Sequence, residues 1–468
     1  MSRYAHPAGA RHAEGTDHGP AWLAVPSDVN ALVPQIWATS VERGTDGVLT
    51  VGGVDVRDLA EQYGTPAYIL DEADFRYRAG LFREAFGPGV DVYYAGKAFL
   101  CTEVARWVDQ EGLCLDVSTG GELAVALRAG FPPERLVFHG NNKSVAEIAR
   151  GLDAGVGRFV LDSFEEIARI AYLAEERGVR PRVMIRVTVG VEAHTHEYIA
   201  TAHEDQKFGF SLANGAAAEA VRRVLMLPSL ELRGLHSHIG SQIFDPSGFE
   251  VAARRIIGLQ AEVRDEHGLE LPDIDLGGGF GIAYTNEDDP EPVKIVAAGI
   301  VDAVRGECLR HGLSVPRLSV EPGRAIVGPS AFTLYEVGTV KPVDLGNGAS
   351  RLYVSVDGGM SDNIRPALYD AAYSCLLASR SSEAPPTLSR VVGKHCESGD
   401  IVVHDEFLPA DVAPGDLLAV PATGAYCRSM ASNYNHVPRP PVVAIAGGSS
   451  RVIVRRETED DLLGLDVP

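Results

Sequence analysis

The sequence predicts an α/β protein, in which a (β/α)8 barrel of the TIM type accompanies a β-sandwich or β-barrel domain formed by the two ends of the chain. Short apolar runs alternate with helix-like stretches between about residues 73 and 328, and eight such runs occur. No Gly-x-Gly-x-x-Gly follows the first run, which favours the barrel over an open doubly wound sheet. After Arg324 helical periodicity nearly vanishes, and short runs rich in Val, Leu and Tyr predict strands.

Composition limits the classes of partner. The 468 residues carry 64 acidic and 42 basic side chains, with a formal net charge of −22. Such acidity disfavours nucleic acid and anionic membranes, although a local basic pocket can still bind a small anion. We find no apolar run that could span a membrane and no signal peptide. The six cysteines contain no Cys-x-x-Cys pair, so we expect a reducing, cytoplasmic location.

The expected organisation has four parts. Residues 1–20 form a flexible tail, 21–72 the first part of the β domain, 73–328 the barrel, and 329–468 the rest of the β domain. In the first part of the β domain we expect strands at 48–51, 54–56 and 67–70, and a short helix at 58–64. In the last part we expect strands at 334–340, 351–356, 391–393, 401–403 and 417–420.

The barrel elements follow from repetition. Strands are expected at 90–95, 114–118, 136–139, 158–162, 182–189, 232–239, 273–276 and 317–321. The first four begin roughly 22 to 24 residues apart, which suits one β/α unit. Among the helices, 163–177 has an apolar stripe, and Ser163 and Glu166 predict a capping box at its start.

Lys97 ends the first barrel strand, in the sequence Tyr94-Ala95-Gly96-Lys97-Ala98. Barrel enzymes place their chemistry at the carboxyl ends of the strands. A lysine held there with a neutral amine can form a Schiff base with an aldehyde cofactor. A surface lysine that merely follows a strand is the alternative for Lys97 taken alone.

Two segments after the last strands predict a phosphate site. Leu276-Gly277-Gly278-Gly279-Phe280-Gly281 follows the seventh strand, and glycines let backbone N–H groups approach a phosphate. Glu321-Pro322-Gly323-Arg324 ends the eighth strand. The glutamate can hold a pyridine nitrogen protonated while the arginine meets an anion. A tight turn and a plain ion pair are the alternatives.

His236-Ser237-His238-Ile239-Gly240-Ser241 ends the sixth strand. A pair of histidines on one face could bind a metal, but no third ligand occurs at suitable spacing, so we expect no metal. A histidine ring stacked on a planar cofactor, with Ser241 on its phosphate, is the better interpretation.

The β domain holds three polar segments among its strands. They are Cys396-Glu397-Ser398-Gly399-Asp400, Gly424-Ala425-Tyr426-Cys427 and Asn363-Ile364-Arg365-Pro366-Ala367-Leu368-Tyr369. The first looks less like core than a lone buried cysteine would, and the other two could be ordinary loops.

Together with Asp116-Val117-Ser118-Thr119-Gly120-Gly121-Glu122, and in this order along the chain, these motifs resemble those of the fold type III pyridoxal-phosphate (PLP) decarboxylases. The resemblance covers about residues 45 to 450 and is greatest to the diaminopimelate-specific branch. It implies a cytoplasmic, PLP-dependent homodimer that decarboxylates meso-2,6-diaminopimelate to L-lysine and CO2.

The resemblance also implies roles for individual residues. Lys97 would carry the cofactor, His238 would stack on its ring and Glu321 would pair with its pyridine nitrogen. Cys396 would return a proton to the substrate and, with Glu397, would reach the partner subunit's site. The remaining cofactor-binding residues would be Ser241, Gly278, Gly279, Gly323, Arg324 and Tyr426. The substrate-binding residues would be Arg324, Arg365, Tyr369, Glu397 and Tyr426.

Other functions share parts of this pattern. A decarboxylase of ornithine, arginine or carboxynorspermidine would use the same cofactor machinery. An amino-acid racemase needs a second base and is usually shorter. A non-catalytic relative should lack Lys97 or Cys396, and both are present. A phosphosugar barrel enzyme without cofactor is the most distant alternative.

Overall fold

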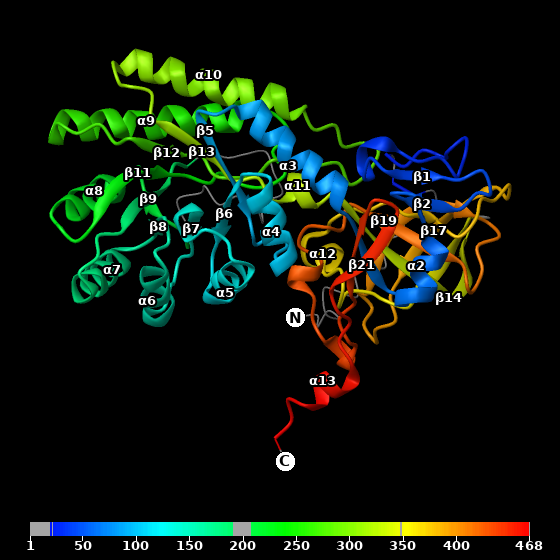
Figure 1. Cartoon of the computed structure of the whole chain (residues 1–468). Helices are drawn as coiled ribbons and strands as arrows, with labels where there is room; N and C mark the ends of the chain where they lie inside the picture. Colours follow the sequence, from blue (N-terminus) through cyan, green and yellow to red (C-terminus); the bar gives the residue numbers. More distant parts are fainter. Residues whose placement is uncertain (1–18, 21, 191–206, 347–348, 468) are drawn as a thin grey trace, which may run out of the picture. The chain divides into compact units, whose positions relative to one another are not determined.

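The computed structural model describes residues 19–20, 22–190, 207–346 and 349–467 (Figure 1). The chain divides into two compact units. The barrel unit comprises Arg76–Ile282 and Pro290–Ile326, and the β unit comprises the chain up to Phe75, Ala283–Asp289 and the chain from Val327 onward. Apart from Gly19 and Pro20, the tail expected at 1–20 lies outside the described residues. No helix in the described ranges is long and apolar enough to cross a membrane.

The predicted barrel is confirmed. Eight parallel strands form a closed ring in the order β9-β11-β12-β13-β5-β6-β7-β8, with β8 hydrogen-bonded back to β9. They are β5 (Val90–Ala95), β6 (Cys114–Val117), β7 (Leu136–Phe138), β8 (Arg158–Leu161), β9 (Arg182–Thr188), β11 (Glu231–His236), β12 (Asp273–Asp275) and β13 (Arg317–Val320). A short strand that we did not predict, β10 (Phe210–Ser211), pairs with β9 outside the ring. Tyr93, Val137, Val160 and Met184 form a buried cluster from four of the strands, as expected for a filled barrel interior.

Helices between the strands cover the barrel (Figure 1). They are α3 (Glu72–Phe86), α4 (Thr102–Gln110), α5 (Gly120–Ala129), α6 (Val145–Ala154), α7 (Phe164–Arg177), α8 (Ala216–Leu225), α9 (Ser247–His267) and α10 (Val293–His311). A single turn, α11 (Arg324–Val327), follows β13. In α7, Ser163 caps the first turn by accepting the N–H of Glu166, and Gly178 ends the helix with a φ of 61°.

The capping box predicted for α7 is wrong in its second half. The Glu166 carboxylate accepts the N–H of Asp162 at 2.8 Å, not that of Ser163. Its other oxygen, Oε1, lies 2.9 Å from Nζ of Lys143, which is almost fully buried. A buried ammonium needs a counter-charge more than a helix end needs a second cap. Complete capping boxes occur instead at Ser144 and Glu147 in α6 and at Thr458 and Asp461 at the start of α13 (Glu459–Leu463).

The β unit draws strands from both ends of the chain, as predicted. Its N-terminal elements are β1 (Val41–Arg43), β2 (Leu49–Val51), β3 (Val54–Asp55), α2 (Val56–Tyr63) and β4 (Ala67–Asp71). Its C-terminal elements are β14 (Ala331–Gly346), β15 (Ala349–Val356), α12 (Arg365–Tyr369), β16 (Leu376–Leu377), β17 (Pro386–Val392), β18 (Ile401–Pro409), β19 (Leu417–Pro421), β20 (Val442–Ala446), β21 (Ser449–Val454) and α13 (Glu459–Leu463). In the larger sheet β4 lies between β14 and β20, so the two ends of the chain share one hydrogen-bonded layer.

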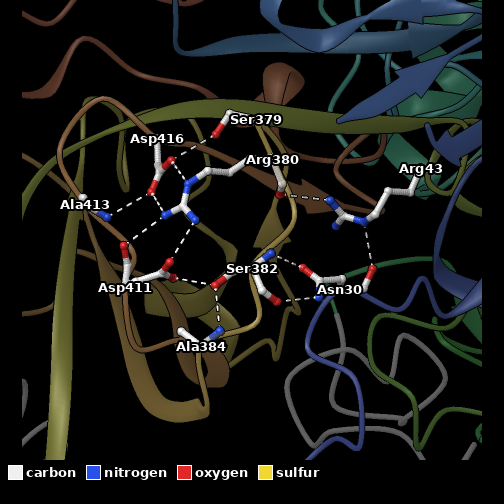
Figure 2. Close-up of polar contacts among 9 residues, drawn as sticks. All are labelled: Asn30, Arg43, Ser379, Arg380, Ser382, Ala384, Asp411, Ala413 and Asp416. Atoms are coloured by element: carbon white, nitrogen blue, oxygen red, sulfur yellow. Dashed lines mark hydrogen bonds and ion pairs between the residues drawn. The ribbon is translucent and has the colours of Figure 1, made fainter. Parts of the chain in front are cut away.

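Polar contacts also fasten the N-terminal segment to the C-terminal strands (Figure 2). The side chain of Asn30 donates to the carbonyl of Ser382 and accepts from its N–H, at 2.8 and 2.9 Å. Arg43 donates to the carbonyl of Arg380, whose own guanidinium holds Asp416 through two bonds of 2.8 Å. These contacts order the loops around Arg380 and Asp411 in the β unit.

Candidate active site

The carboxyl ends of the barrel strands bring together a lysine, two histidines and two carboxylates. Lys97 follows β5, and its Nζ lies 3.4 Å from Oδ2 of Asp116 on β6. The Lys97 side chain is 40% exposed, whereas that of Asp116 is 1% exposed. The amine is therefore accessible on one side and held by a buried carboxylate on the other.

Glu321, directly after β13, is buried between two imidazoles. Its Oε1 lies 2.8 Å from Nε2 of His139 and 3.3 Å from Nε2 of His236. The two histidine rings meet edge to face, with centroids 4.9 Å apart. Both imidazoles contact the same oxygen, so Oε2 of Glu321 takes part in neither of these two contacts.

These contacts set the charges at the base of the site. Burial alone would raise the pKa of Glu321, but His139 and His236 hold it well below its usual value. Burial opposes the charged form of His139, yet Asp116 and Glu321 outweigh it and raise the pKa of His139. Burial lowers the pKa of His236 to about 4. Near neutral pH Glu321 is therefore a carboxylate, and His236 is a neutral ring beside it.

We did not predict His139 as a site residue. We also did not predict that His139 and Glu321 lie close enough to His236 for the three to bind one metal ion. The ligand atoms of His139, His236 and Glu321 lie within 4.8 Å of one another. Two groups from other strands, His139 and Glu321, therefore lie beside His236, which spacing along the sequence did not show, and the expectation of no metal stays a prediction. A polar residue directly after Leu136-Val137-Phe138 was the available indication for His139.

His238 lies beyond the end of β11, which stops at His236. Its Nδ1 accepts the N–H of Gly278 at 3.2 Å, which fixes the ring beside the glycine-rich loop. Burial, followed by the charge of Lys97, holds the pKa of His238 well below its usual value. A neutral, half-buried ring is suited to stacking on a planar group.

The glycine-rich loop approaches other backbone too closely for side chains. A Cβ at Gly278 would lie 2.2 Å from the carbonyl oxygen of Glu321, and one at Gly279 would lie 2.5 Å from that of Gly240. Gly279 also has a φ of 110°. Nearby, Nη2 of Arg324 donates to Oγ of Ser241 at 2.9 Å. A hydroxyl, a guanidinium and glycine N–H groups together form a donor set that suits a phosphate.

Gly323 packs where the Glu321 and Lys97 segments meet. A Cβ at Gly323 would lie 2.9 Å from both Cβ and the carbonyl oxygen of Ala95. A partly exposed amine, a buried anionic oxygen and an anion-binding loop fit PLP, which carries an aldehyde, a pyridine nitrogen and a phosphate.

The other predicted site residues lie in the β unit. Arg365 begins α12, a helical turn where we left open an ordinary loop, and is 4% exposed. Its Nη1 donates to the hydroxyl of Tyr373 at 2.5 Å, and its guanidinium carbon lies 4.7 Å from the ring centroid of Tyr284. No carboxylate of the described residues pairs with Arg365. Arg365 is therefore a buried cation that forms no ion pair with the described carboxylates.

Cys396 and Glu397 are exposed in the loop between β17 and β18, and Tyr369 is half-buried at the end of α12. Tyr426 is half-buried and has a φ of 62°. Backbone conformations of this kind are uncommon outside glycine and concentrate at functional sites. Cys396, Glu397, Tyr369 and Tyr426 thus all lie in segments that connect strands of the β unit.

Comparisons with known proteins identify the family of the chain. Residues 72–328 match the family model of the pyridoxal-dependent decarboxylases, pyridoxal binding domain. A diaminopimelate decarboxylase of Mycobacterium leprae is 56% identical over 468 residues, which cover 99% of each chain.

Solved structures give the same relationship. The diaminopimelate decarboxylase of M. jannaschii is 32% identical with a TM-score of 0.86, covering 92% of this chain and 98% of that one. The Helicobacter pylori enzyme, solved with L-lysine, is 31% identical with a TM-score of 0.79, covering 88% and 98%. The chain therefore belongs to the pyridoxal-dependent decarboxylases and, among them, to the diaminopimelate decarboxylases.

Proposed function

We propose that the protein decarboxylates meso-2,6-diaminopimelate to L-lysine and CO2 with PLP as cofactor. The observation that carries this proposal is Arg365, a buried guanidinium that pairs with no carboxylate among the described residues, in a chain of this family. Diaminopimelate differs from lysine by a second carboxylate, which such a guanidinium can bind. The Helicobacter pylori relative was solved in complex with L-lysine, the expected product.

In the barrel unit, Lys97 would hold the cofactor through its amine, and His238 would lie against its ring. Ser241, Gly278, Gly279 and Arg324 would bind the phosphate. When bound, the protonated pyridine ring supplies a sink for the electron pair that the departing carboxylate leaves behind. Glu321 would accept the N–H of that ring, because its low pKa leaves it an anionic oxygen.

In the β unit, Cys396 acts as the general acid that returns a proton to the α-carbon of the substrate. Arg365 pairs with the distal carboxylate and Glu397 with the distal ammonium, while Tyr369 and Tyr426 line the substrate. We assign the cluster of His139, His236 and Glu321 to the cofactor ring rather than to a metal ion.

We further propose a homodimer in which Cys396 and Glu397 complete the partner subunit's site. The exposed position of both residues allows them to reach another chain. The protein would work in the cytoplasm, since none of the six cysteines forms a disulfide, as a reducing compartment favours.

The test is release of CO2 from diaminopimelate, ornithine, arginine and lysine by the purified holoenzyme. We expect turnover of diaminopimelate with L-lysine as the product. A higher kcat/KM for ornithine or arginine would overturn the substrate assignment, and no release from any of the four would overturn the activity.

A further inference from the structure

The loop that carries Cys396 is anchored by the residue before it. His395 is 8% exposed, although its neighbours Lys394 and Cys396 are exposed. Its Nε2 lies 2.8 Å from Oγ of Ser361, and its Nδ1 lies 3.3 Å from Oδ1 of Asn435. The imidazole therefore connects three segments of the β unit that are distant in the sequence.

Asp400 closes the same loop from its other end. Its carboxylate, 3% exposed, accepts the N–H of His395 at 2.7 Å and the N–H of Met360 at 2.6 Å. Its carbonyl accepts the N–H of Gly393 at 2.9 Å. Both ends of the loop are thus tied to the segment around Met360.

That segment leads directly to Arg365. The carbonyl of Ser361 accepts the N–H of Ser432 at 2.9 Å. Two residues further on, Oδ1 of Asn363 accepts the N–H of Arg365 at 3.3 Å and the thiol of Cys427 at 3.5 Å. The contacts of His395 therefore end at the segment that orients the buried guanidinium.

The hydrogen-bond roles of His395 follow from its neighbours. Oδ1 of Asn435 already accepts the N–H of Cys396 at 3.2 Å, so it is an acceptor. Nδ1 of His395 must then donate to it, and in the neutral ring Nε2 accepts the hydroxyl hydrogen of Ser361. One imidazole with its proton on Nδ1 satisfies both partners.

Asn435 lies in a segment of left-handed backbone. Its φ is 51°, and that of the next residue, His436, is 55°. Such backbone persists where the surrounding contacts impose it. The bonds of the Asn435 side chain to Cys396 and His395 are contacts of that kind.

We propose that His395 is a positioning residue that holds the Cys396 loop in place through Ser361 and Asn435. The proposal rests on the roles given above to Cys396 and to the homodimer. The thiol would have to reach the α-carbon of a substrate bound in the partner subunit's site. The bonds of His395 would set where the thiol lies when the two chains meet.

The test compares the holoenzyme with His395→Ala, His395→Gln and Ser361→Ala. We expect His395→Ala to lower kcat by about 10- to 100-fold, since small misplacements of a reacting group cost that much, with a smaller change in KM. His395→Gln, which can reach one of the two partners, should lose less. The double variant of His395→Ala and Ser361→Ala should lose no more kcat than His395→Ala alone, because both substitutions remove the same hydrogen bond. His404→Gln, a histidine on β18 of the same unit, should match the wild type.

A second measurement follows the loop itself. Alkylation of Cys396 by iodoacetamide, read by peptide mass spectrometry, should be slowed by saturating L-lysine in the wild type. In His395→Ala this protection should be largely lost, while the melting temperature and the bound PLP stay unchanged. If His395→Ala does not fold, the Ser361→Ala and His395→Gln variants carry the same comparison.

The outcomes separate this inference from the proposed function. Unchanged kcat and unchanged lysine protection in folded His395 and Ser361 variants would overturn the positioning role. Full activity of Cys396→Ala would instead overturn the role of Cys396 in the proposed function. A loss that falls only on PLP content or melting temperature would make His395 a structural residue.

Discussion

Replacing Arg365 by alanine should abolish most of the catalysis of diaminopimelate decarboxylation and leave folding intact. Arg365 is 4% exposed and pairs with no carboxylate of the described residues. Its guanidinium contacts are the Tyr373 hydroxyl and the rings of Tyr284 and Tyr373. Removing it therefore leaves no described carboxylate without its counter-charge.

The magnitude follows from the state of the substrate carboxylate. Truncating one partner of a desolvated charge pair costs about 2–5 kcal/mol. With about 1.4 kcal/mol per factor of ten, kcat/KM for diaminopimelate should fall by about 30-fold to about 4,000-fold. Arg365→Lys should lose less, because it keeps the charge but not the planar fork of donors.

Arg351→Ala provides the matched control. Arg351 is 1% exposed in the same unit, but its Nη2 donates to Oδ1 of Asp405 at 2.7 Å. Its removal weakens the pairing of a partly buried carboxylate, although Arg390 remains 3.7 Å from it. We expect a loss of about 1.5–3 kcal/mol in the free energy of unfolding and little change in kcat/KM of the folded fraction.

The assay combines CO2 release with urea unfolding and PLP absorbance for both variants. Activity of Arg365→Ala within a few-fold of the wild type would refute the assignment of Arg365 to the distal carboxylate. A loss of stability comparable to that of Arg351→Ala would refute the argument that removing Arg365 leaves no buried carboxylate unpaired.

Three further predictions concern the barrel and the dimer. Borohydride reduction of the holoenzyme followed by peptide mapping should place the pyridoxyl group on Lys97, and a label on another lysine would contradict its role. Lys97→Ala and Cys396→Ala homodimers should each be nearly inactive. Mixing the two with verified subunit exchange should restore about a quarter of wild-type activity, because half of the dimers are hybrids with one intact site. No recovery would mean that Cys396 acts in the site of its own chain or in no site. His139 has a raised pKa in the folded state, so its contribution to stability is complete below its usual pKa of 6.5 and declines as the pH rises through the folded-state value. The stability advantage of the wild-type apoprotein over His139→Gln in urea should therefore shrink above pH 6.5, and a constant difference would mean that the imidazole is neutral throughout.

The repeating part of the fold could be read from the sequence because its determinants are local. The apolar run at 90–95 and the seven that follow it became strands within a few residues of their predicted ends. Side-chain alternation, a serine cap such as Ser163 and a terminal glycine such as Gly178 act between neighbours in the chain. The same local reading placed Lys97 and Glu321 after strands, where barrel chemistry lies.

Tertiary structure alone decided which groups meet. The sequence positions of His139, His236 and Glu321 do not show that folding brings both imidazoles to one carboxylate oxygen of Glu321. Lys143 took Glu166 away from the predicted capping box, because a buried ammonium needs a counter-charge that only the folded chain supplies.

The sequence by itself determined the barrel and the types of residue at its rim, because helix caps, turns and apolar periods depend on neighbouring residues. It could not determine that Arg365 is buried without a carboxylate, or that His395 joins Ser361 to Asn435. Burial and pairing depend on the whole set of groups that surround a side chain, and those groups come from segments that only folding brings into contact.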